Sequence, residues 1–392
     1  MNYLQQQFIT FIQNGKLPQI QSFYEDYKLH IDISANNEHA FRYACYNGHL
    51  ELAQWLYQIK PTIDISANNE YTFRYACENG HLDIAQWLYL IKPTINISAK
   101  NEYAFRYACE NGHLELAQWL YQIKPTIDIS GDSEEPFRTA CRKGHLELAQ
   151  WLYQIKPTIH ISAKNEDAFR GACINGHLEL AQWLYKIKPT IHISAKNEDA
   201  FRWTCEYGNL ELAQWLYQIK PTIDISANNE HAFRWACGHG HLELAQWLYK
   251  IKPTIDISAN NEYAFRYACY NRHLELAQWL YQIKPTIDIS ANNKHAFRWA
   301  CENGHLELAQ WLQTLIPYGL YYTFEVDENN KITSHSTEKL NYSFLKKRLD
   351  IVHSGNEICF REALVRNRFH PKYMDKWVDW GHEEDEDFDM ME

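Results

Sequence analysis

Cysteine and histidine recur four residues apart along the chain, a combination whose side chains can bind zinc. Nine of the ten cysteines fall at intervals of 32 residues, from Cys45 to Cys301, and His49 begins a parallel series. Zinc ligands must converge within about 2 Å of the metal, but packed helices lie roughly 8–10 Å apart. Asn209 also interrupts the histidine series. We therefore expect no metal site, and instead histidines that hydrogen-bond to a neighbouring loop.

The same spacing argues against disulfide bonds, which need Cα atoms within about 7 Å of each other. We expect each cysteine to be a free thiol packed between helices, in a reducing environment. Arg42 also recurs in every copy, and we expect an ion pair or a bond to loop carbonyls for it. The sequence has no glycine-rich phosphate loop, nucleophile elbow or His-Glu-x-x-His motif. It therefore predicts no catalytic residue and no cofactor.

The spacing of apolar residues predicts the elements that carry these side chains. Phe41, Ala44, Cys45 and Gly48 are spaced i, i+3, i+4 and i+7, which is one face of a short helix. Asn37 is the expected N-cap of this helix, since its side chain can bind the free N–H groups of the first turn.

A tight turn at Gly48 and a second helix complete the helical part of the repeat. Glycine accepts left-handed backbone angles at little cost, whereas Arg272 at this position should cost about 1 kcal/mol. Pro61 ends the second helix, and the alternation in Ile63-Asp64-Ile65 predicts a short extended arm. The apolar stripe of the second helix consists of Leu52, Trp55, Leu56 and Ile59.

Helices of about ten residues are marginal in water when isolated, so each repeat must bury its stripe against the next one. Identical faces recur because every unit meets an identical neighbour. The predicted fold is all-α: a solenoid of stacked helix-turn-helix repeats with a 32-residue period and short extended arms.

The repeat resembles the ankyrin repeat over roughly residues 33–317. Phe41 takes the place of the leucine in the family's Thr-Pro-Leu-His, Ala44-Cys45 that of Ala-Ala, and Gly48-His49 that of Gly-His. Tetratricopeptide repeats are the alternative, but their two longer helices leave no room for the arm. The period is 32 instead of the family's 33, and Lys60-Pro61-Thr62 replaces the glycine that ends the second helix. The arrays look especially like those of giant amoeba-infecting, mimivirus-like viruses.

The ends of the array are expected to be caps, which solenoids need. Residues 1–32 are predicted to form an N-terminal capping repeat, followed by nine repeats over 33–317. Residues 318–380 are predicted to form a divergent cap, with a hairpin around Asp327-Glu328-Asn329-Asn330, then a helix and a final repeat. Residues 381–392 form an acidic tail that we expect to be disordered.

Charge and hydropathy exclude several classes of partner. The net charge is −11 with no basic stripe, which argues against nucleic acid. The sequence has no run of about 18 apolar residues, so it predicts no membrane span. The N-terminus lacks the pattern of a signal peptide. We expect a monomer in the cytoplasm, which would be the host cytoplasm if the protein is viral.

The copies disagree mainly at three sites of the first helix, those of residues 39, 43 and 46. These positions are i, i+4 and i+7, so they form a second stripe on the helix. We expect this stripe to be exposed, because a buried site responds to a single methylene group. The middle column contains Tyr43, Tyr75, Tyr107, Thr139, Gly171, Trp203, Trp235, Tyr267 and Trp299.

Exposed tyrosine and tryptophan dominate binding hot spots, and the resemblance implies that this face lines a concave groove that binds partners. We therefore expect two aromatic patches on either side of a small, acidic saddle around Asp167 and Asp199. The alternative is a structural ladder of stacked rings. The residues predicted to contact a partner are Tyr43, Tyr75, Tyr107, Trp203, Trp235, Tyr267, Trp299, His39, Tyr71, Tyr103, Asp167, Asp199, His231, Tyr263, His295, Tyr46 and Tyr270.

The sequence thus predicts a protein–protein interaction scaffold that binds an unknown protein, a host protein if the chain is viral. One alternative is an adaptor that presents a bound target to the host ubiquitin-ligase machinery through residues 318–380. A second alternative, an enzyme or a nucleic-acid binder, is opposed by the missing motifs and by the negative charge.

Overall fold

The structure is a computed structural model and describes residues 3–315, 323–327, 329 and 331–336. The chain divides into two compact units, Met1–Thr204 with Gln214–Pro221 and Cys205–Ala213 with Thr222–Glu392. Both units are built from the same helix-turn-helix repeat, so the predicted all-α repeat solenoid is confirmed.

Each repeat contributes a first helix of 12 or 13 residues and a second helix of 9 or 10 residues. The first helices are α3 (Ala35–Tyr46), α5 (Ala67–Glu78), α7 (Ala99–Glu110), α9 (Gly131–Lys143), α11 (Ala163–Ile174), α13 (Ala195–Glu206), α15 (Ala227–Gly238), α17 (Ala259–Tyr270) and α19 (Ala291–Glu302). The second helices are α4 (Leu50–Ile59), α6 (Leu82–Ile91), α8 (Leu114–Ile123), α10 (Leu146–Ile155), α12 (Leu178–Ile187), α14 (Leu210–Ile219), α16 (Leu242–Ile251), α18 (Leu274–Ile283) and α20 (Leu306–Thr314).

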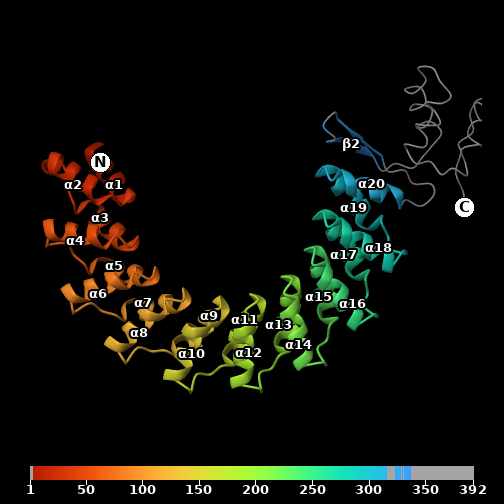
Figure 1. Cartoon of the computed structure of the whole chain (residues 1–392), viewed down its shortest axis with the longest axis horizontal. Helices are drawn as coiled ribbons and strands as arrows, with labels where there is room; N and C mark the ends of the chain where they lie inside the picture. Colours follow the sequence, from red (N-terminus) through yellow and green to blue (C-terminus); the bar gives the residue numbers. More distant parts are fainter. Residues whose placement is uncertain (1–2, 316–322, 328, 330, 337–392) are drawn as a thin grey trace, which may run out of the picture. The chain divides into compact units, whose positions relative to one another are not determined.

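The apolar face predicted for the first helix seals neighbouring repeats together. Phe41, Ala44 and Cys45 are fully buried, and the first helices α3, α5, α7, α9 and α11 lie side by side in one row (Figure 1). The ring of Phe41 lies 6.0 Å from that of Trp87 in the next repeat. Tyr57 meets the same tryptophan edge-on at 5.9 Å. Equivalent pairs recur along both units, so each tryptophan joins the two helices of one repeat to the next.

The start of the first helix differs from the prediction, which was wrong for Asn37. Instead of capping the helix with its side chain, Asn37 lies with Asn36 and Glu38 in a turn of left-handed backbone, with φ between 55° and 60°. Asparagine tolerates this region better than most residues, because its short polar side chain can hydrogen-bond locally. The Glu38 N–H donates to the Ser34 carbonyl at 3.2 Å, which closes the turn. The same left-handed turn lies within the first four residues of the first helix in repeats one to eight.

The repeated arginine stabilises this left-handed turn. Arg42 donates from Nε to the Asn37 carbonyl at 2.7 Å and from Nη2 to the Asn36 carbonyl at 3.1 Å. Left-handed backbone costs roughly 1–2 kcal/mol per ordinary residue, and charge-assisted hydrogen bonds offset part of that cost. The expected bond from this arginine to loop carbonyls is therefore confirmed.

The glycine turn of one repeat packs against the histidine ring of the next repeat. Gly48 has a φ of 81°, and a β-carbon on it would lie 2.7 Å from the His81 ring of the next repeat. That ring is hydrogen-bonded through Nε2 to the Tyr46 carbonyl at 2.9 Å. The predicted bond from histidine to a neighbouring loop is confirmed. Arg272 adopts the same left-handed conformation as the glycines, with a φ of 67°.

The arm alternates as its sequence predicts, since Ile63 and Ile65 are buried and Asp64 is exposed. The nine cysteines in the part of the chain that the structure describes are free and buried. Burial raises the pKa of the Cys45 and Cys77 thiols above the usual cysteine value, so the thiol form is favoured over the reactive thiolate.

At the N-terminus, α1 (Tyr3–Asn14), α2 (Leu17–Tyr27) and the short 3-10 helix η1 (Lys28–His30) precede the first repeat. Beyond the last repeat, β1 (Thr323–Val326) and β2 (Ile332–Ser336) pair antiparallel, which confirms the predicted hairpin. Asp327 Oδ1 accepts hydrogen bonds from the backbone N–H groups of Asn329 and Lys331, both at 2.9 Å. The expected helix, final repeat and acidic tail after Ser336 lie outside the described residues, and the domain boundaries stay a prediction. None of the described helices is long and apolar enough to cross a membrane.

We predict that Phe105→Ala lowers the free energy of unfolding by about 3–5 kcal/mol, because it removes a buried ring and leaves a cavity. Phe105 is fully buried and lies 6.4 Å from Trp151 of the next repeat. The exposed Gln118→Ala, on the second helix of the same repeat, is the control and should change stability by less than about 0.5 kcal/mol. Urea unfolding followed by circular dichroism measures both, and equal midpoints for the two variants would contradict the prediction.

The turn histidines make stability depend on pH. Burial lowers the pKa of His113, His145 and His241 below the usual histidine value, although a backbone carbonyl near each ring opposes the shift. The neutral rings therefore contribute stability that is complete above the ordinary pKa of about 6.5 and is lost as the pH falls through the lower folded value.

We predict that His145→Asn, which copies the natural Asn209, reduces the loss of thermal stability between about pH 7 and pH 5. His160→Asn in the exposed arm is the control, because its ring is not enclosed by a neighbouring turn. Melting temperatures measured across this range give the slope for each protein. A slope unchanged by His145→Asn would show that this histidine does not contribute to the acid sensitivity.

Candidate partner-binding face

We define the first-helix face as the three variable positions of each first helix, which are those of His39, Tyr43 and Tyr46 and their equivalents. The prediction that this face is exposed was wrong for several members. Tyr46 and Tyr270 are exposed at 42% and 37%, but the seven aromatic residues of the middle column are half-buried. The buried members are Thr139, Gly171, Glu206, His231, Gly238 and Tyr263.

In the N-terminal repeats, the aromatic residues are half-buried because they cover one another. Tyr71 stacks on Tyr75 at 4.2 Å between ring centroids, and Tyr103 stacks on Tyr107 at the same distance. Between repeats, Tyr75 lies 6.0 Å from Tyr46 and 5.7 Å from Tyr103. These rings form a ladder across α3, α5 and α7, as the alternative interpretation of the sequence predicted. Ring pairs of this kind contribute about 0.5–1.5 kcal/mol each beyond the area they bury.

The second unit carries an equivalent ladder. Tyr263 stacks on Tyr267 at 4.1 Å and contacts Trp235 of the preceding repeat at 5.4 Å. In the last repeat, Trp299 lies 3.7 Å from Tyr270 and 3.8 Å from His295. The variable face is thus also a packed surface between repeats.

In six repeats, the arginine of the left-handed turn reaches the residue that lies 29 positions further along the chain. Where that residue is tyrosine, the guanidinium lies over the ring, as for Arg42 on Tyr71 at 4.9 Å and Arg74 on Tyr103 at 4.6 Å. Where it is acidic, an ion pair forms, as between Arg106 and Glu135. Sequence reasoning missed this coupling, although the constant spacing between the arginine and the variable position was available as a signal.

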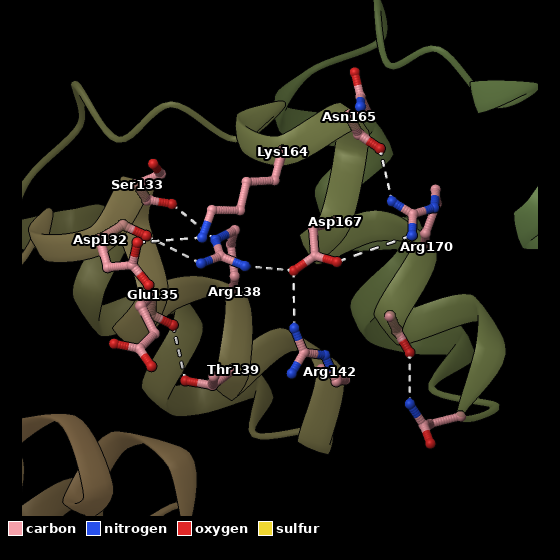
Figure 2. A network of polar contacts seen from close by, with 12 residues as sticks. Asp132, Ser133, Glu135, Arg138, Thr139, Arg142, Lys164, Asn165, Asp167 and Arg170 are labelled. Carbon is pink, nitrogen blue, oxygen red and sulfur yellow. Dashed lines mark hydrogen bonds and ion pairs between the residues drawn. The ribbon is translucent and has the colours of Figure 1, made fainter. Parts of the chain in front are cut away.

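Near the C-terminal end of the first unit, two carboxylates on α11 and α13 are each contacted by several arginines. Asp167 accepts from Arg138 Nη1 at 2.6 Å and from Arg142 Nη2 at 2.8 Å, and it lies 3.9 Å from Arg170 (Figure 2). Arg170 Nε also donates to an Asp199 carboxylate oxygen at 3.0 Å.

Asp199 is similarly occupied from its own helix. Arg202 Nη2 lies 3.1 Å from Asp199 Oδ1, and Trp203 Nε1 donates to the same oxygen at 2.8 Å. We call Arg138, Arg142, Arg170 and Arg202, with Asp167 and Asp199, the arginine cluster. The prediction of an acidic saddle was wrong, because four guanidinium groups surround its two carboxylates. The comparison of variable positions did not reveal these guanidinium groups, because three of the four arginines occupy a position that is constant in every repeat.

The saddle is nevertheless small, as its sequence suggested. A β-carbon at Gly171 would lie 3.0 Å from Arg142 Cβ and 3.2 Å from its Cα. Glycine therefore lets the Arg142 side chain cross to Asp167. Burial alone would raise the pKa of Asp167, but hydrogen bonds and charge from Arg138 and Arg142 hold it below the usual aspartate value.

Other predicted residues meet polar neighbours from the preceding repeat. The Tyr103 hydroxyl donates to Glu78 Oε2 at 2.5 Å, and burial together with this bond raises the pKa of Tyr103 above its usual value. His231 Nε2 lies 3.6 Å from Glu206 Oε2, and both side chains are buried. Within the described ranges, no group of three histidine, cysteine or acidic side chains is arranged to hold a metal ion.

Repeat spacing, the Gly-His turn and paired helices all agree with one family. Residues 8–101, 73–165, 169–261 and 233–317 each match the family model described as ankyrin repeats in three copies. The chain belongs to the ankyrin-repeat family. A comparison with curated proteins finds no match. The ankyrin match concerns the repeat itself, and the more specific likeness to giant-virus arrays stays a prediction.

We predict that Asp167→Asn destabilises the protein by about 3 kcal/mol, because it leaves the Arg138 guanidinium buried without its charged partner. The control is Asp132→Asn, which removes a carboxylate that is 59% exposed and should cost less than about 1 kcal/mol. Because the folded pKa of Asp167 is lowered, its contribution is complete above the ordinary value of about 3.9 and disappears in stronger acid. Unfolding free energies of wild type and variant should therefore converge in acid; a gap that persists there would contradict this account.

Proposed function

We propose that the protein is a non-enzymatic interaction module that binds a partner protein through the first-helix face. Ankyrin repeats are generally protein–protein interaction modules, and this family assignment covers nearly all of residues 8–317. The observation that carries the choice of face is where the repeats diverge. Phe41 and Arg42 keep their identity in all nine copies, whereas the neighbouring position of Tyr43 holds tyrosine, tryptophan, threonine or glycine.

Packing alone would not require this divergence. Phe41 shows that one residue type can serve nine equivalent packing sites, since its copies are all fully buried. The first-helix face lies on an equally periodic backbone beside the same repeated arginine, yet its side chains change from repeat to repeat. A partner that contacts several repeats with different parts of its own surface would account for the variation, because each repeat would then meet different chemistry.

The half-buried rings also have the properties of binding anchors. Stacking fixes Tyr75 and Tyr107 before a partner arrives, so little side-chain entropy is lost on binding. Both residues remain partly accessible, and tyrosine and tryptophan are enriched among residues that dominate interface energies. The aromatic ladder therefore supports recognition as well as stacking. Whether the partner is a host protein, and whether residues 318–380 recruit ubiquitin-ligase subunits, stay predictions, since most of that segment lies outside the described residues.

We predict that Trp203→Ala and Trp235→Ala each weaken partner binding by at least about tenfold, which is the loss typical of an aromatic hot spot. Each change should also lower stability by about 1 kcal/mol, because the removed ring contacts its neighbours. The measurement is affinity purification of the full-length chain from expressing cells, followed by titration of the captured partner with each variant.

The matched control is Trp183→Ala on a second helix, whose ring packs against Phe137 and Tyr153. This change should destabilise the fold without touching the first-helix face. Loss of binding that follows stability equally in all three variants would assign the aromatic face a purely structural role and would refute the proposal.

A further inference from the structure

The arginine cluster carries more positive than negative charge. Its four guanidinium groups share the two carboxylates of Asp167 and Asp199, which leaves an excess of two positive charges. Neighbouring charges do not remove this excess, because they lie beside charges of opposite sign. The buried glutamates of the same repeats, Glu134, Glu166 and Glu198, each accept from a serine hydroxyl that also accepts from a lysine, so a positive charge lies close to each of them. Glu135 pairs with Arg106, and Asp132 pairs with Lys164, so each of these two pairs is neutral by itself.

Three of the four guanidinium groups are held in the interior. The side chains of Arg138, Arg170 and Arg202 are 6%, 8% and 10% exposed. Each also donates to a carbonyl of its own left-handed turn, as Arg138 Nε does to Ser133 at 2.7 Å. These arginines are therefore fixed by the repeat and cannot move out into solvent, where water would screen their charge.

Arg142 differs from these three arginines in its position, its exposure and its hydrogen bonding. It lies one turn further along α9, its side chain is 42% exposed, and it donates one hydrogen bond, from Nη2 to Asp167. Because Gly171 has no side chain, the Arg142 side chain can pack directly on the next repeat, where a β-carbon would lie 3.0 Å from Arg142 Cβ. Figure 2 shows Arg142, Arg138 and Arg170 converging on Asp167 from two helices.

This arrangement favours an additional negative charge from outside. Charges held away from water are costly when they are not balanced, and a positive field in a partly desolvated site attracts and orients carboxylates. Arginine is also suited to binding a carboxylate through two parallel hydrogen bonds. We propose that the arginine cluster is the part of the first-helix face that takes an acidic segment of the partner protein, with Arg142 as the contact residue. This inference rests on the proposed function of that face.

An acidic protein segment fits the surroundings better than a nucleic acid does. A nucleic acid carries a phosphate at every nucleotide and would extend past the cluster along neighbouring repeats. The arms of the first and third repeats expose Asp64 and Asp128, which would repel it. The ring faces of Tyr71 and Tyr103 are already stacked on neighbouring tyrosines and are not open to bases. A short acidic segment needs to contact only the repeats of α9, α11 and α13.

The test uses a fluorescein-labelled oligoglutamate peptide, with fluorescence anisotropy on the full-length chain at low and at physiological ionic strength. Arg142→Glu should weaken peptide binding by at least about tenfold and Arg142→Gln by about threefold, since the first reverses the contact charge and the second only removes it. Lys143→Glu is the matched control. It reverses the charge of the adjacent exposed residue and should change the affinity by less than about twofold.

Several results would overturn the inference. These are a wild-type chain that does not bind the peptide, equal losses for Arg142→Glu and Lys143→Glu, or binding of oligolysine as tight as that of oligoglutamate. A single-stranded oligodeoxynucleotide that binds more tightly than the peptide, and is lost in Arg142→Glu, would instead assign the cluster to nucleic acid. Circular dichroism melts of each variant confirm that the proteins compared are folded.

The failure of this inference can be told apart from failure of the proposed function. If Arg142 variants keep the captured partner while Trp203→Ala and Trp235→Ala lose it, the face binds a partner but the cluster does not take an acidic segment. If none of these variants changes partner binding, the proposed function of the face is itself wrong.

Discussion

The hydrogen bonds from one repeated arginine to the carbonyls of a left-handed turn are the interaction on which the rest of the structure depends. Arg42 and its equivalents hold three residues in a conformation that is unfavourable for most side chains. This fixes where the first helix begins and therefore where its buried and variable faces point. The same guanidinium then reaches the first variable residue of the next repeat. One side chain thus joins local backbone geometry to the stacking of repeats and to the composition of the candidate binding face.

This coupling explains how a face can vary and still be packed. A buried position usually tolerates little change, because its neighbours are fixed. Here the neighbours also differ from repeat to repeat. Gly171 has Arg142 lying across it, and a β-carbon on Gly238 would lie 3.3 Å from Tyr267 Cβ. Tyrosine, an acidic residue or glycine can each be accommodated when the adjoining repeat supplies a complementary group. The aromatic ladders and the arginine cluster are two solutions to the same packing problem, and they give the first unit two chemically different surfaces.

Much of the fold could be predicted from the sequence, and the candidate site could be predicted only in part. The 32-residue period, the two helices, the free buried cysteines, the histidine bonds and the hairpin near Asp327 follow from local patterns of apolar and turn residues. Burial at Tyr263 and the positive charge around Asp167 did not follow, because these depend on residues 25 to 29 positions away. The left-handed turn was missed for a similar reason. Asparagine suits both an N-cap and left-handed backbone, and the contact from Arg42 decides between them.

By itself the sequence determined which residues form helices and which face of each helix seals the stack, since these properties arise from spacing within one repeat. Only the tertiary structure decided the accessibility and charge of the remaining face. Each of those side chains is covered, paired or left open by groups of the adjacent repeat, and electrostatic balance is a property of the whole cluster. Asp167 is acidic in the sequence, but three guanidinium groups surround it in the folded protein.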